Sequence, residues 1–342
     1  MRIAVDAMGS DTHPEPDVAG AVMAAREFGD TIFLVGDGAG IEAELAKQNT
    51  ANLSLEIVHS AEVVIMSDKP ADVVKGKPGS SMHVGLRLVR EGQADAFVTA
   101  GNTGAALGIA MLRAVGLGRI PGVMRPALGV VFPTKERPFL IDNGANTDCK
   151  PEYLRQFGVM GSLYVERVLD VERPRVALIS TGEEEGKGNL LVKEAIPLLA
   201  NSDLNYIGNI EPKEFMQGVA DVAVTDGFTG NVLMKTAEAT AKYMSEAIRS
   251  EAKKSPLSLL GGLLMRPAFK RIRRQLDPNE VGGALLLGVN GVVVIAHGRS
   301  NAYAIKQAIG QARRLAEKDI VGAIRGGISV IGNVATRPPR VR

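Results

Sequence analysis

The 342-residue chain is predicted to fold as an α/β protein around a largely parallel sheet. Short runs rich in Val, Ile and Phe alternate with amphipathic runs of helical length, which is the pattern of repeated βαβ units. Glycine is abundant: it accounts for 39 of the 342 residues, well above the average share of about 7%. Polar glycine-containing loops follow most of the predicted strands. Hydrophobic residues make up 45% of the chain, which is enough for a large buried core.

In the first half, each predicted strand is a short apolar run that ends near a polar or glycine residue. The run Ile3–Met8 (IAVDAM) opens the series and continues into a polar loop. A Gly-Asn-Thr-Gly turn precedes the helix expected at 104. The strands expected here are 3–8, 31–35, 55–58, 96–99, 128–132 and 139–141, and the helices are 16–28, 41–48, 80–90 and 104–114.

The same alternation continues in the second half. Pro151 lies at the first turn of a long predicted helix, where its fixed φ is favourable. The uncharged run 281–296 is shorter than the roughly 20 residues that span a bilayer, and Gly-Val-Asn-Gly interrupts it, so we expect a buried strand or a turn plus a strand. The helices expected are 151–169, 190–199, 231–253 and 300–318, and the strands are 176–180, 206–210, 222–225 and 292–296.

The composition excludes several classes of protein. A net charge of +2 gives no argument for nucleic-acid binding, and an aromatic share of 4% argues against stacking platforms for bases. Cys149 is the one cysteine, so an internal disulfide and a cysteine-based zinc site are excluded. The four histidines are not spaced as metal ligands, so we expect no metal and no cofactor. Met1 runs directly into a strand without a targeting signal, which predicts a cytoplasmic protein.

Six loops are predicted to carry the chemistry. In parallel sheets, ligands bind at the carboxyl ends of the strands, and here the loops after residues 5, 99, 141, 180, 225 and 296 combine Gly with Asn, Thr, Ser or Asp. Several precede a helix, whose N-terminus favours phosphate. We expect the six loops to share one edge of the sheet. The candidate substrate- and phosphate-binding residues are Asp6, Gly9, Ser10, Gly101, Asn102, Thr103, Gly104, Asn143, Asn146, Gly188, Gly227, Thr229, Gly230, Asn231 and Ser300.

Two glycine-rich segments do not match nucleotide-binding motifs. Gly182–Gly188 (GEEEGKG) has only three residues between its first two glycines, and no Ser or Thr follows Lys187, so it is not a P-loop. Gly36–Gly40 lacks the third glycine of a dinucleotide fingerprint.

The loop sequences together resemble the phosphate acyltransferase PlsX family. The motifs run in the family's order from residue 1 to about residue 309, and TDGFTGNV and GEEEGKGN are the most specific. At the first loop the chain departs from the family, with Ser10 where a glycine is usual. The matching segments are MRIAVDAMGSD, TAGNTGAAL, RPAL, IDNGANTDCKP, STGEEEGKGN, IGNIEPKEF, DVAVTDGFTGNVLMKTAE and GVNGVVVIAHGRS.

The resemblance implies a fold similar to isocitrate dehydrogenase and phosphotransacetylase, with three α/β/α layers, a mixed sheet and a homodimer. It implies transfer of a long-chain fatty acyl group from acyl-[acyl carrier protein] to inorganic phosphate. The acyl phosphate would then serve an acyl-phosphate:glycerol-3-phosphate acyltransferase in phospholipid (phosphatidic acid) synthesis. We expect one α/β catalytic unit over 1–335, with two intertwined subdomains as the alternative, and a basic tail over 336–342.

The expected mechanism is direct attack of phosphate on the thioester. Such a site must hold a dianion and stabilise an oxyanion and a departing thiolate. The candidate catalytic residues are Lys187, Asn189, Asp226 and His297. The alternative for Lys187 is a surface lysine paired with Glu183–Glu185. Cys149 could instead form an acyl-cysteine, but no histidine is near it in sequence, and a lone cysteine is usually a small buried hydrophobe.

Residues 255–274 (SPLSLLGGLLMRPAFKRIRR) place an apolar patch beside a basic cluster. This pattern suits an interfacial segment on an anionic membrane, and a buried dimer or core helix is the alternative. Gly261–Gly262 and Pro267 suggest a tip between two helices, so we expect a helical tip over 250–280 for membrane or dimer contact, at the inner face of the plasma membrane. The expected membrane contacts are Leu257, Leu260, Leu263, Leu264 and Phe269.

Other functions remain open from the sequence. A short-chain, CoA-dependent phosphotransacetylase would share the fold class and the chemistry. A non-catalytic, membrane-associated scaffold would not need six polar loops. A decarboxylating dehydrogenase would need a metal-binding carboxylate cluster and a nicotinamide site, and we find neither in the sequence. An acidic carrier protein should dock on a basic surface. Arg113, Arg119 and Arg125, or the 266–274 cluster, are the candidates for that surface.

Overall fold

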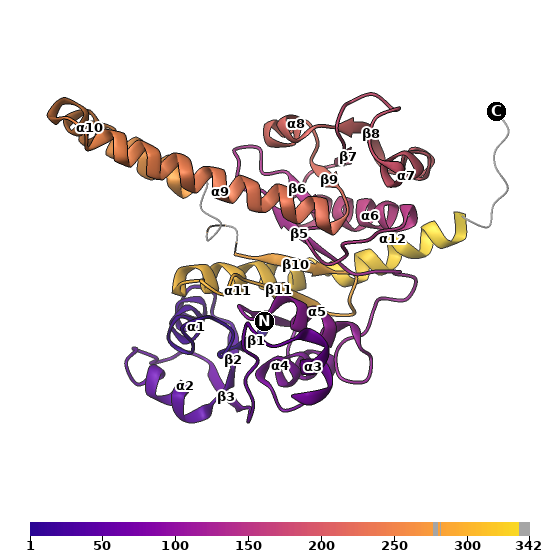
Figure 1. Cartoon of the computed structure of the whole chain (residues 1–342). Helices are drawn as coiled ribbons and strands as arrows, with labels where there is room; N and C mark the ends of the chain where they lie inside the picture. The colour runs from indigo at the N-terminus through magenta and orange to yellow at the C-terminus, as the bar shows by residue number, and fades with distance from the viewer. Residues whose placement is uncertain (276–279, 281, 335–342) are drawn as a thin grey trace.

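The computed structural model describes residues 1–275, 280 and 282–334, and these residues form one eleven-stranded sheet between helices (Figure 1). The strands are β1 (Arg2–Asp6), β2 (Thr31–Gly36), β3 (Leu55–His59), β4 (Ala96–Thr99), β5 (Ala127–Val131), β6 (Phe139–Ile141), β7 (Arg175–Ile179), β8 (Asn205–Ile210), β9 (Val222–Val224), β10 (Ala284–Leu287) and β11 (Val292–Ile295). Their order across the sheet is β3-β2-β1-β4-β11-β10-β5-β6-β9-β7-β8.

The helices follow the alternation that the sequence predicts. They are α1 (Glu15–Phe28), α2 (Gly38–Leu45), α3 (Pro70–Gly76), α4 (Ser81–Arg90), α5 (Thr103–Met111), α6 (Pro151–Val168), α7 (Leu190–Ala200), α8 (Pro212–Gln217), α9 (Gly227–Ala252), α10 (Pro256–Gln275), α11 (Ala302–Glu317) and α12 (Ile320–Val334). None of the helices in the described ranges is both long and apolar enough to cross a membrane.

The sheet contains two parallel groups of strands that run in opposite directions. One group is β3, β2, β1, β4 and β11, and the other is β6, β9, β7 and β8. Three antiparallel pairings, β11–β10, β10–β5 and β5–β6, separate the groups. Because three is an odd number of reversals, the loops after β1, β4 and β11 leave one edge, whereas those after β6, β7 and β9 leave the other. The mixed sheet is confirmed, and the expectation of one shared edge is wrong.

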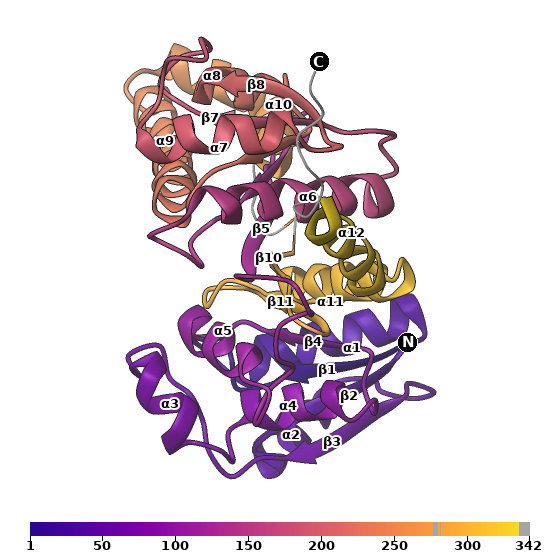
Figure 2. The same ribbon diagram turned by 90° about the vertical axis from the view of Figure 1, so that its right-hand side faces the viewer.

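Alternate residues of each strand point to opposite faces of the sheet. In β1, Ile3 and Val5 join an apolar cluster with α1, α6, α7, α11 and α12, whereas Ala4 joins a cluster with α4 and α5. On this second face, α8 and α9 cover the other group of strands through a separate cluster that includes Phe215 and Met234. Helices therefore cover both faces, which gives three α/β/α layers (Figure 2).

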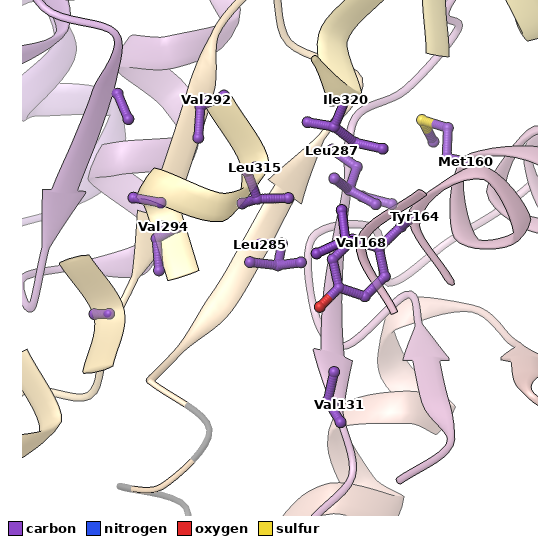
Figure 3. Packing of buried hydrophobic residues seen from close by; sticks show 14 of the residues in the cluster. Val131, Met160, Tyr164, Val168, Leu285, Leu287, Val292, Val294, Leu315 and Ile320 are labelled. Atoms are coloured by element: carbon purple, nitrogen blue, oxygen red, sulfur yellow. The ribbon is translucent and has the colours of Figure 1, made fainter. Parts of the chain in front are cut away.

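The middle strands are anchored beneath the C-terminal helices. Figure 3 shows Leu285 and Leu287 of β10 beside Leu315, Ile320 and Tyr164, which come from the helical layer. These side chains are at most 3% exposed. Burying a side chain of this size contributes roughly 1.5–3 kcal/mol, so this cluster stabilises the middle of the sheet between the two parallel groups.

Three helices were not expected from the sequence. Short helices α3 and α8 each begin at a proline, Pro70 and Pro212, which is a start signal that could have identified them. In α12, Ile320, Ile324 and Ile328 are buried at a spacing of four residues, which is the helical period.

Helices α9 and α10 form a hairpin that projects from the rest of the molecule (Figure 1). Helix α10 continues through Gly261–Gly262 and Pro267, so the reversal expected near these residues lies at 253–255 instead. The expected membrane contacts on α10 are all exposed: Leu257 (81%), Leu260 (56%), Leu263 (56%), Leu264 (76%) and Phe269 (36%). They are therefore not core residues of this chain.

Candidate functional site

A buried carboxylate, Asp6, joins the loops that follow β1 and β4. Its Oδ1 accepts the N–H of Met8 at 3.1 Å, and its Oδ2 accepts the hydroxyl of Thr99 at 2.7 Å. The same hydroxyl oxygen accepts the N–H of Gly101 at 3.0 Å. Burial raises the pKa of Asp6 above its usual value. Asp6 was predicted to bind substrate, but the structure makes it a brace between two loops.

The loop after β1 is held by its backbone and by one serine. A Cβ on Gly9 would lie only 2.8 Å from the nitrogen of Ala100, so this close approach requires glycine. The hydroxyl of Ser10 is buried and donates to Oδ2 of Asp17 at 2.5 Å. Ser10 therefore stabilises the loop and does not present its hydroxyl to a ligand, contrary to the sequence-based expectation.

Helix α5 begins with a neutral cap at the edge of this loop group. Oδ1 of Asn102 accepts the N–H of Ala105 at 3.0 Å, and its Nδ2 donates to two carbonyls of segment 66–68. The first turn carries no acidic residue. The amide of Asn102 is thus used internally, and the backbone N–H groups of Thr103 and Gly104, which have no intrahelical acceptor, are the donors available to an anion.

A second buried carboxylate, Asp142, organises the loop after β6. Its Oδ1 accepts the N–H groups of Leu128 (2.9 Å) and Ala145 (3.1 Å), and its Oδ2 accepts the backbone (2.7 Å) and side-chain (2.9 Å) N–H groups of Asn146. Burial raises the pKa of Asp142. The sequence analysis did not select this residue, although Asp142, like Asp6, lies at the carboxyl end of a strand.

Asn146 connects this loop to the start of α9. Its Nδ2 also donates to the carbonyl of Pro126 at 2.8 Å, and its own carbonyl accepts the N–H of Gly227 at 2.7 Å. A Cβ on Gly230 would lie 2.0 Å from the carbonyl oxygen of Asp142, so backbone packs against backbone here. Asn146 is consequently a brace, and its side-chain donors are not available to phosphate.

Helix α9 begins at Gly227 and not at Asn231 as expected. Asp226 caps it, with Oδ1 accepting the N–H of Thr229 and Oδ2 accepting the hydroxyl of Thr229, both at 2.8 Å. A carboxylate at this position already compensates the helix dipole. The expectation that Asn231 forms the helix N-terminus is therefore wrong, and the acidic cap makes this helix start less favourable for phosphate. The side chain of Asn231 is exposed and lies beside Gly144.

The loop after β7 presents Lys187 to solvent. Lys187 forms no ion pair with Glu183, Glu184 or Glu185, all of which lie in the described part of the chain. Its N–H donates to the carbonyl of Glu184 at 2.9 Å, and the buried Asn209 of β8 donates its Nδ2–H to the same carbonyl at 3.2 Å. The loop is thus fixed while the lysine ammonium stays unpaired. The pairing alternative for Lys187 is not observed.

The remaining predicted residues of these loops divide between caps and buried positions. Asn189 caps α7, since its Oδ1 accepts the N–H of Val192 at 2.9 Å. Gly188 has a φ of +98°, which favours glycine. Ser300 is buried, and its N–H donates to the carbonyl of His297 at 2.8 Å. The Oδ1 of Asn143 is buried without a hydrogen-bond partner in the structure.

The two loop groups approach each other between α5 and α9. His297, which follows β11, lies close enough to α9 for the charges of Lys235 and Glu238 to shift its pKa. Ala145, from the loop after β6, packs against the apolar cluster beneath α4 and α5. Opposite edges of one sheet thus contribute to one region. Lys235 was missed in the sequence analysis, although it lies in the motif TDGFTGNVLMKTAE.

His297 is a neutral hydrogen-bond donor in this arrangement. Its side chain is exposed, yet partial loss of hydration and the positive charges of Lys235 and Arg299 lower its pKa below the usual value. Its Nδ1 accepts the N–H of Arg299 at 3.3 Å. In the neutral ring the proton is then on Nε2, which can donate to an anionic ligand.

Cys149 does not have the surroundings of a nucleophile. Burial, and then the negative charge of Asp142, raise the pKa of its thiol to about 12. Its Sγ lies 3.5 Å from the carbonyl of Asn146, and it packs against the main apolar cluster. A thiol that stays protonated at neutral pH is a poor nucleophile.

Comparison with known proteins places the chain among acyltransferases. A family model described as "Fatty acid synthesis protein" matches residues 1–322. A phosphate acyltransferase from Elusimicrobium minutum is 44% identical over 331 residues, 96% of each chain. One from Acidobacterium capsulatum is 48% identical over 309 residues, 90% of this chain and 91% of the relative.

Solved structures show the same architecture at low identity. A phosphotransacetylase from Streptococcus pyogenes has a TM-score of 0.57 and 17% identity, covering 96% of this chain and 94% of its own. A branched-chain phosphotransacylase from Enterococcus faecalis has a TM-score of 0.58 and 16% identity, covering 92% and 99%. At this identity the similarity is one of fold, and it agrees with the α/β fold expected from the sequence.

Proposed function

The chain belongs to the family described as "Fatty acid synthesis protein", and its similar relatives are phosphate acyltransferases. From this membership we propose which acyl donor the protein uses. The protein is an acyltransferase that uses phosphate and an acyl donor as substrates. The donor proposed is a long-chain acyl-[acyl carrier protein], and the product is an acyl phosphate for phospholipid synthesis. An acyl-phosphate:glycerol-3-phosphate acyltransferase would consume this product.

The distribution of charge around the loops supports a dianionic substrate. The carboxylates of Asp6, Asp17 and Asp142 are buried, and Asp6 and Asp142 accept backbone N–H groups. Helices α5, α7 and α11 instead begin with neutral asparagine caps, and none has an acidic residue in its first turn. Neutral caps leave the partial positive charge of a helix N-terminus available to an anion. This is the observation that carries the proposal.

We assign phosphate to the start of α5, where Thr103 and Gly104 supply N–H donors. A phosphate dianion needs no general base to attack a thioester carbonyl. His297 is assigned to donate its Nε2–H to a phosphate oxygen, and the unpaired ammonium of Lys187 to stabilise the oxyanion or the departing thiolate. Asp226 keeps the role of helix cap and is not assigned a proton-transfer step.

The hairpin of α9 and α10 is assigned to the membrane. Its exposed leucines lie on the same helix as Arg266, Lys270 and Arg271, which are also exposed. Apolar side chains next to cations favour the surface of an anionic bilayer. We place the enzyme in the cytoplasm, peripherally bound to the inner face of the plasma membrane, as a homodimer.

The test is the formation of hydroxylamine-trappable acyl phosphate from palmitoyl-carrier protein and inorganic phosphate. Palmitoyl-CoA and acetyl-CoA are run as alternative donors. The expected result is a phosphate-dependent product with the carrier protein as the preferred donor. Product from acetyl-CoA alone would instead indicate a short-chain phosphotransacetylase. No product from any donor with folded protein would contradict the proposal.

A further inference from the structure

We propose that an exposed arginine surface docks the acidic carrier protein that delivers the acyl group. The arginine surface consists of Arg90, Arg113, Arg119, Arg125 and Arg325. This inference rests on the proposed function, because it concerns the partner of the same reaction. Its starting point is the connection between α5 and β5, residues 112–125, which presents three of the five arginines.

All five arginines are in or against this connection. Arg90, at the end of α4, donates from its guanidinium to the carbonyl of Ala114 at 3.0 Å. Arg119 donates to the carbonyl of Met124. A Cβ on Gly118 would lie 2.5 Å from Cγ of Arg113, so this side chain lies directly against the backbone of the loop.

Arg325 reaches the same connection through one asparagine. Its guanidinium donates to Oδ1 of Asn290 at 2.6 Å, and the N–H of Asn290 donates to the carbonyl of Gly118 at 2.9 Å. Helix α12 therefore adds a cation to the surface built by α4 and the 112–125 connection. Arg90, Asn290 and Arg325 also line an open groove of about 480 Å³.

The arginine surface carries unbalanced positive charge. Residues 112–125 contain no Asp or Glu. Among ion pairs within the described ranges, only Arg90 of the five has a partner, Glu91 at 3.5 Å. Of the two acids that line the groove, Asp95 pairs with Arg2, whereas Asp319 accepts the N–H of Gly322 and keeps its negative charge. Together Asp319 and Glu91 balance only part of the charge of the five arginines. A surface of this sign favours encounter with an acidic partner.

The connection is held in place before any partner binds. The buried side chain of Gln156, on α6, donates to the carbonyl of Gly122 at 2.9 Å and accepts the N–H of Met124 at 2.8 Å. The N–H of Ile120 donates to the carbonyl of Gly288 at 3.0 Å. A loop that is already ordered loses less entropy on binding, which raises affinity.

Two exposed apolar side chains complete the surface. Leu112 is 44% exposed and Met124 is 42% exposed, and both lie within the arginine-bearing connection. Protein interfaces typically combine an apolar centre with a polar rim. Leucine and methionine beside arginines match this composition, whereas a site for a small anion would not need them.

The arginine surface leads directly to the candidate site. Arg125 precedes Pro126, whose carbonyl accepts the side-chain amide of Asn146. Two residues further on, the N–H of Leu128 donates to Asp142. A carrier protein bound here would lie next to the loop after β6, so its flexible prosthetic arm could enter between α5 and α9. The competing basic cluster, 266–274, lies in the projecting α9–α10 hairpin and is assigned to the membrane.

The experiment measures binding of a fluorescently labelled bacterial holo-acyl carrier protein by anisotropy, together with turnover. The test variant reverses two arginines that form no hydrogen bond in the described structure, R113E/R125E, and R113Q/R125Q removes the charge without reversing it. The matched control, R167E/R314E, reverses two exposed arginines on α6 and α11 that are not among the five of the arginine surface. A third variant, K270E/R271E, tests the hairpin.

We expect R113E/R125E to weaken carrier-protein binding at least tenfold and to lower kcat/KM for palmitoyl-carrier protein by a similar factor. Its kcat/KM for palmitoyl-CoA should stay within twofold of the wild type, and so should the carrier-protein affinity of the control. Carrier-protein binding unchanged in R113E/R125E, or lost in K270E/R271E instead, would overturn the docking proposal. Wild-type enzyme that makes no acyl phosphate from palmitoyl-carrier protein would overturn the proposed function itself.

Discussion

The hydroxyl of Ser10 donates to Oδ2 of Asp17 across 2.5 Å, and both side chains are buried. The other oxygen of Asp17 has no hydrogen-bond partner in the structure. Ser10 occupies the position at which the sequence departs from its family resemblance. The hydroxyl of Ser10 is therefore accommodated by a contact to α1 and is not exposed in the site.

Burial of Asp17 gives this residue a pH-dependent effect on stability, which the hydrogen bond from Ser10 partly opposes. Burial raises the pKa of Asp17 to about 8, whereas in the unfolded chain it keeps an ordinary value of about 4. The folded protein retains a proton that the unfolded chain releases between these values. The stabilisation that comes from this bound proton is therefore complete below about pH 4 and is lost as the pH rises toward 8.

Asp17→Asn should remove this dependence. The ratio of the folding equilibrium constants of wild type and Asp17→Asn should fall by up to tenfold per pH unit between pH 5 and 7, and should level off above about pH 8. Urea unfolding at each pH measures both constants. Asp6 and Asp142 also have raised pKa values but are present in both proteins. Parallel stability profiles would show that Asp17 does not hold the proton.

Lys187→Ala should lower kcat at least tenfold without unfolding the protein, because the ammonium is exposed and unpaired. Steady-state kinetics with palmitoyl-carrier protein and phosphate measure the effect. Lys193→Ala, a change at an exposed lysine on α7, is the control and should stay within twofold of the wild type. Equal kinetics for the two variants would remove Lys187 from the mechanism.

Asn209→Ala should reduce turnover by releasing the Lys187 loop. The side chain donates to the carbonyl of Glu184, and such a bond contributes roughly 0.5–1.5 kcal/mol to stability. Asn205→Ala is the matched control, because Asn205 also lies on β8 and donates its amide to a carbonyl, that of Arg173, at 3.0 Å. We expect similar losses of stability but a fall of at least fivefold in kcat only for Asn209→Ala. A comparable fall in both variants would indicate a general effect on β8.

Cys149→Ser should retain kcat within about twofold. A thiol with a pKa of about 12 is protonated at neutral pH, and direct attack by phosphate does not require it. Initial rates and the absence of an acyl-enzyme in intact-mass spectra are the measurements. Loss of activity in the folded variant, with an acylated Cys149 in the wild type, would establish a covalent route instead.

Leu260→Glu should release the protein from anionic vesicles. The side chain is 56% exposed on the projecting hairpin, and a charge there opposes insertion among lipid chains. Co-sedimentation with phosphatidylglycerol-containing vesicles measures binding. Met23→Glu, which adds the same charge at a partly exposed residue of α1, should bind as the wild type does. Unchanged sedimentation of Leu260→Glu would reject the hairpin as the membrane contact.

The sequence was a good guide where the signals are local. The alternation of apolar runs located ten of the observed strands closely, and 281–296 was expected to hold a buried strand or a turn plus a strand, where β10, a turn and β11 lie. Pro151 begins α6 as expected. Local patterns could not show the direction of each strand, because direction depends on pairings such as β10 with β5 that join residues more than 150 positions apart.

The sequence by itself determined the α/β alternation and the glycine-rich loops with polar side chains, because residue types and their order are enough for both. The acyltransferase activity was predicted from the family resemblance of those loops. Only the tertiary structure decided which of those side chains remain available. Asp6, Ser10 and Asn146 have their hydrogen-bonding groups taken by Thr99, Asp17 and Asp142, whereas Lys187 stays unpaired. The reason is physical: a buried polar group must find a partner, and folding chooses that partner from residues distant in the chain.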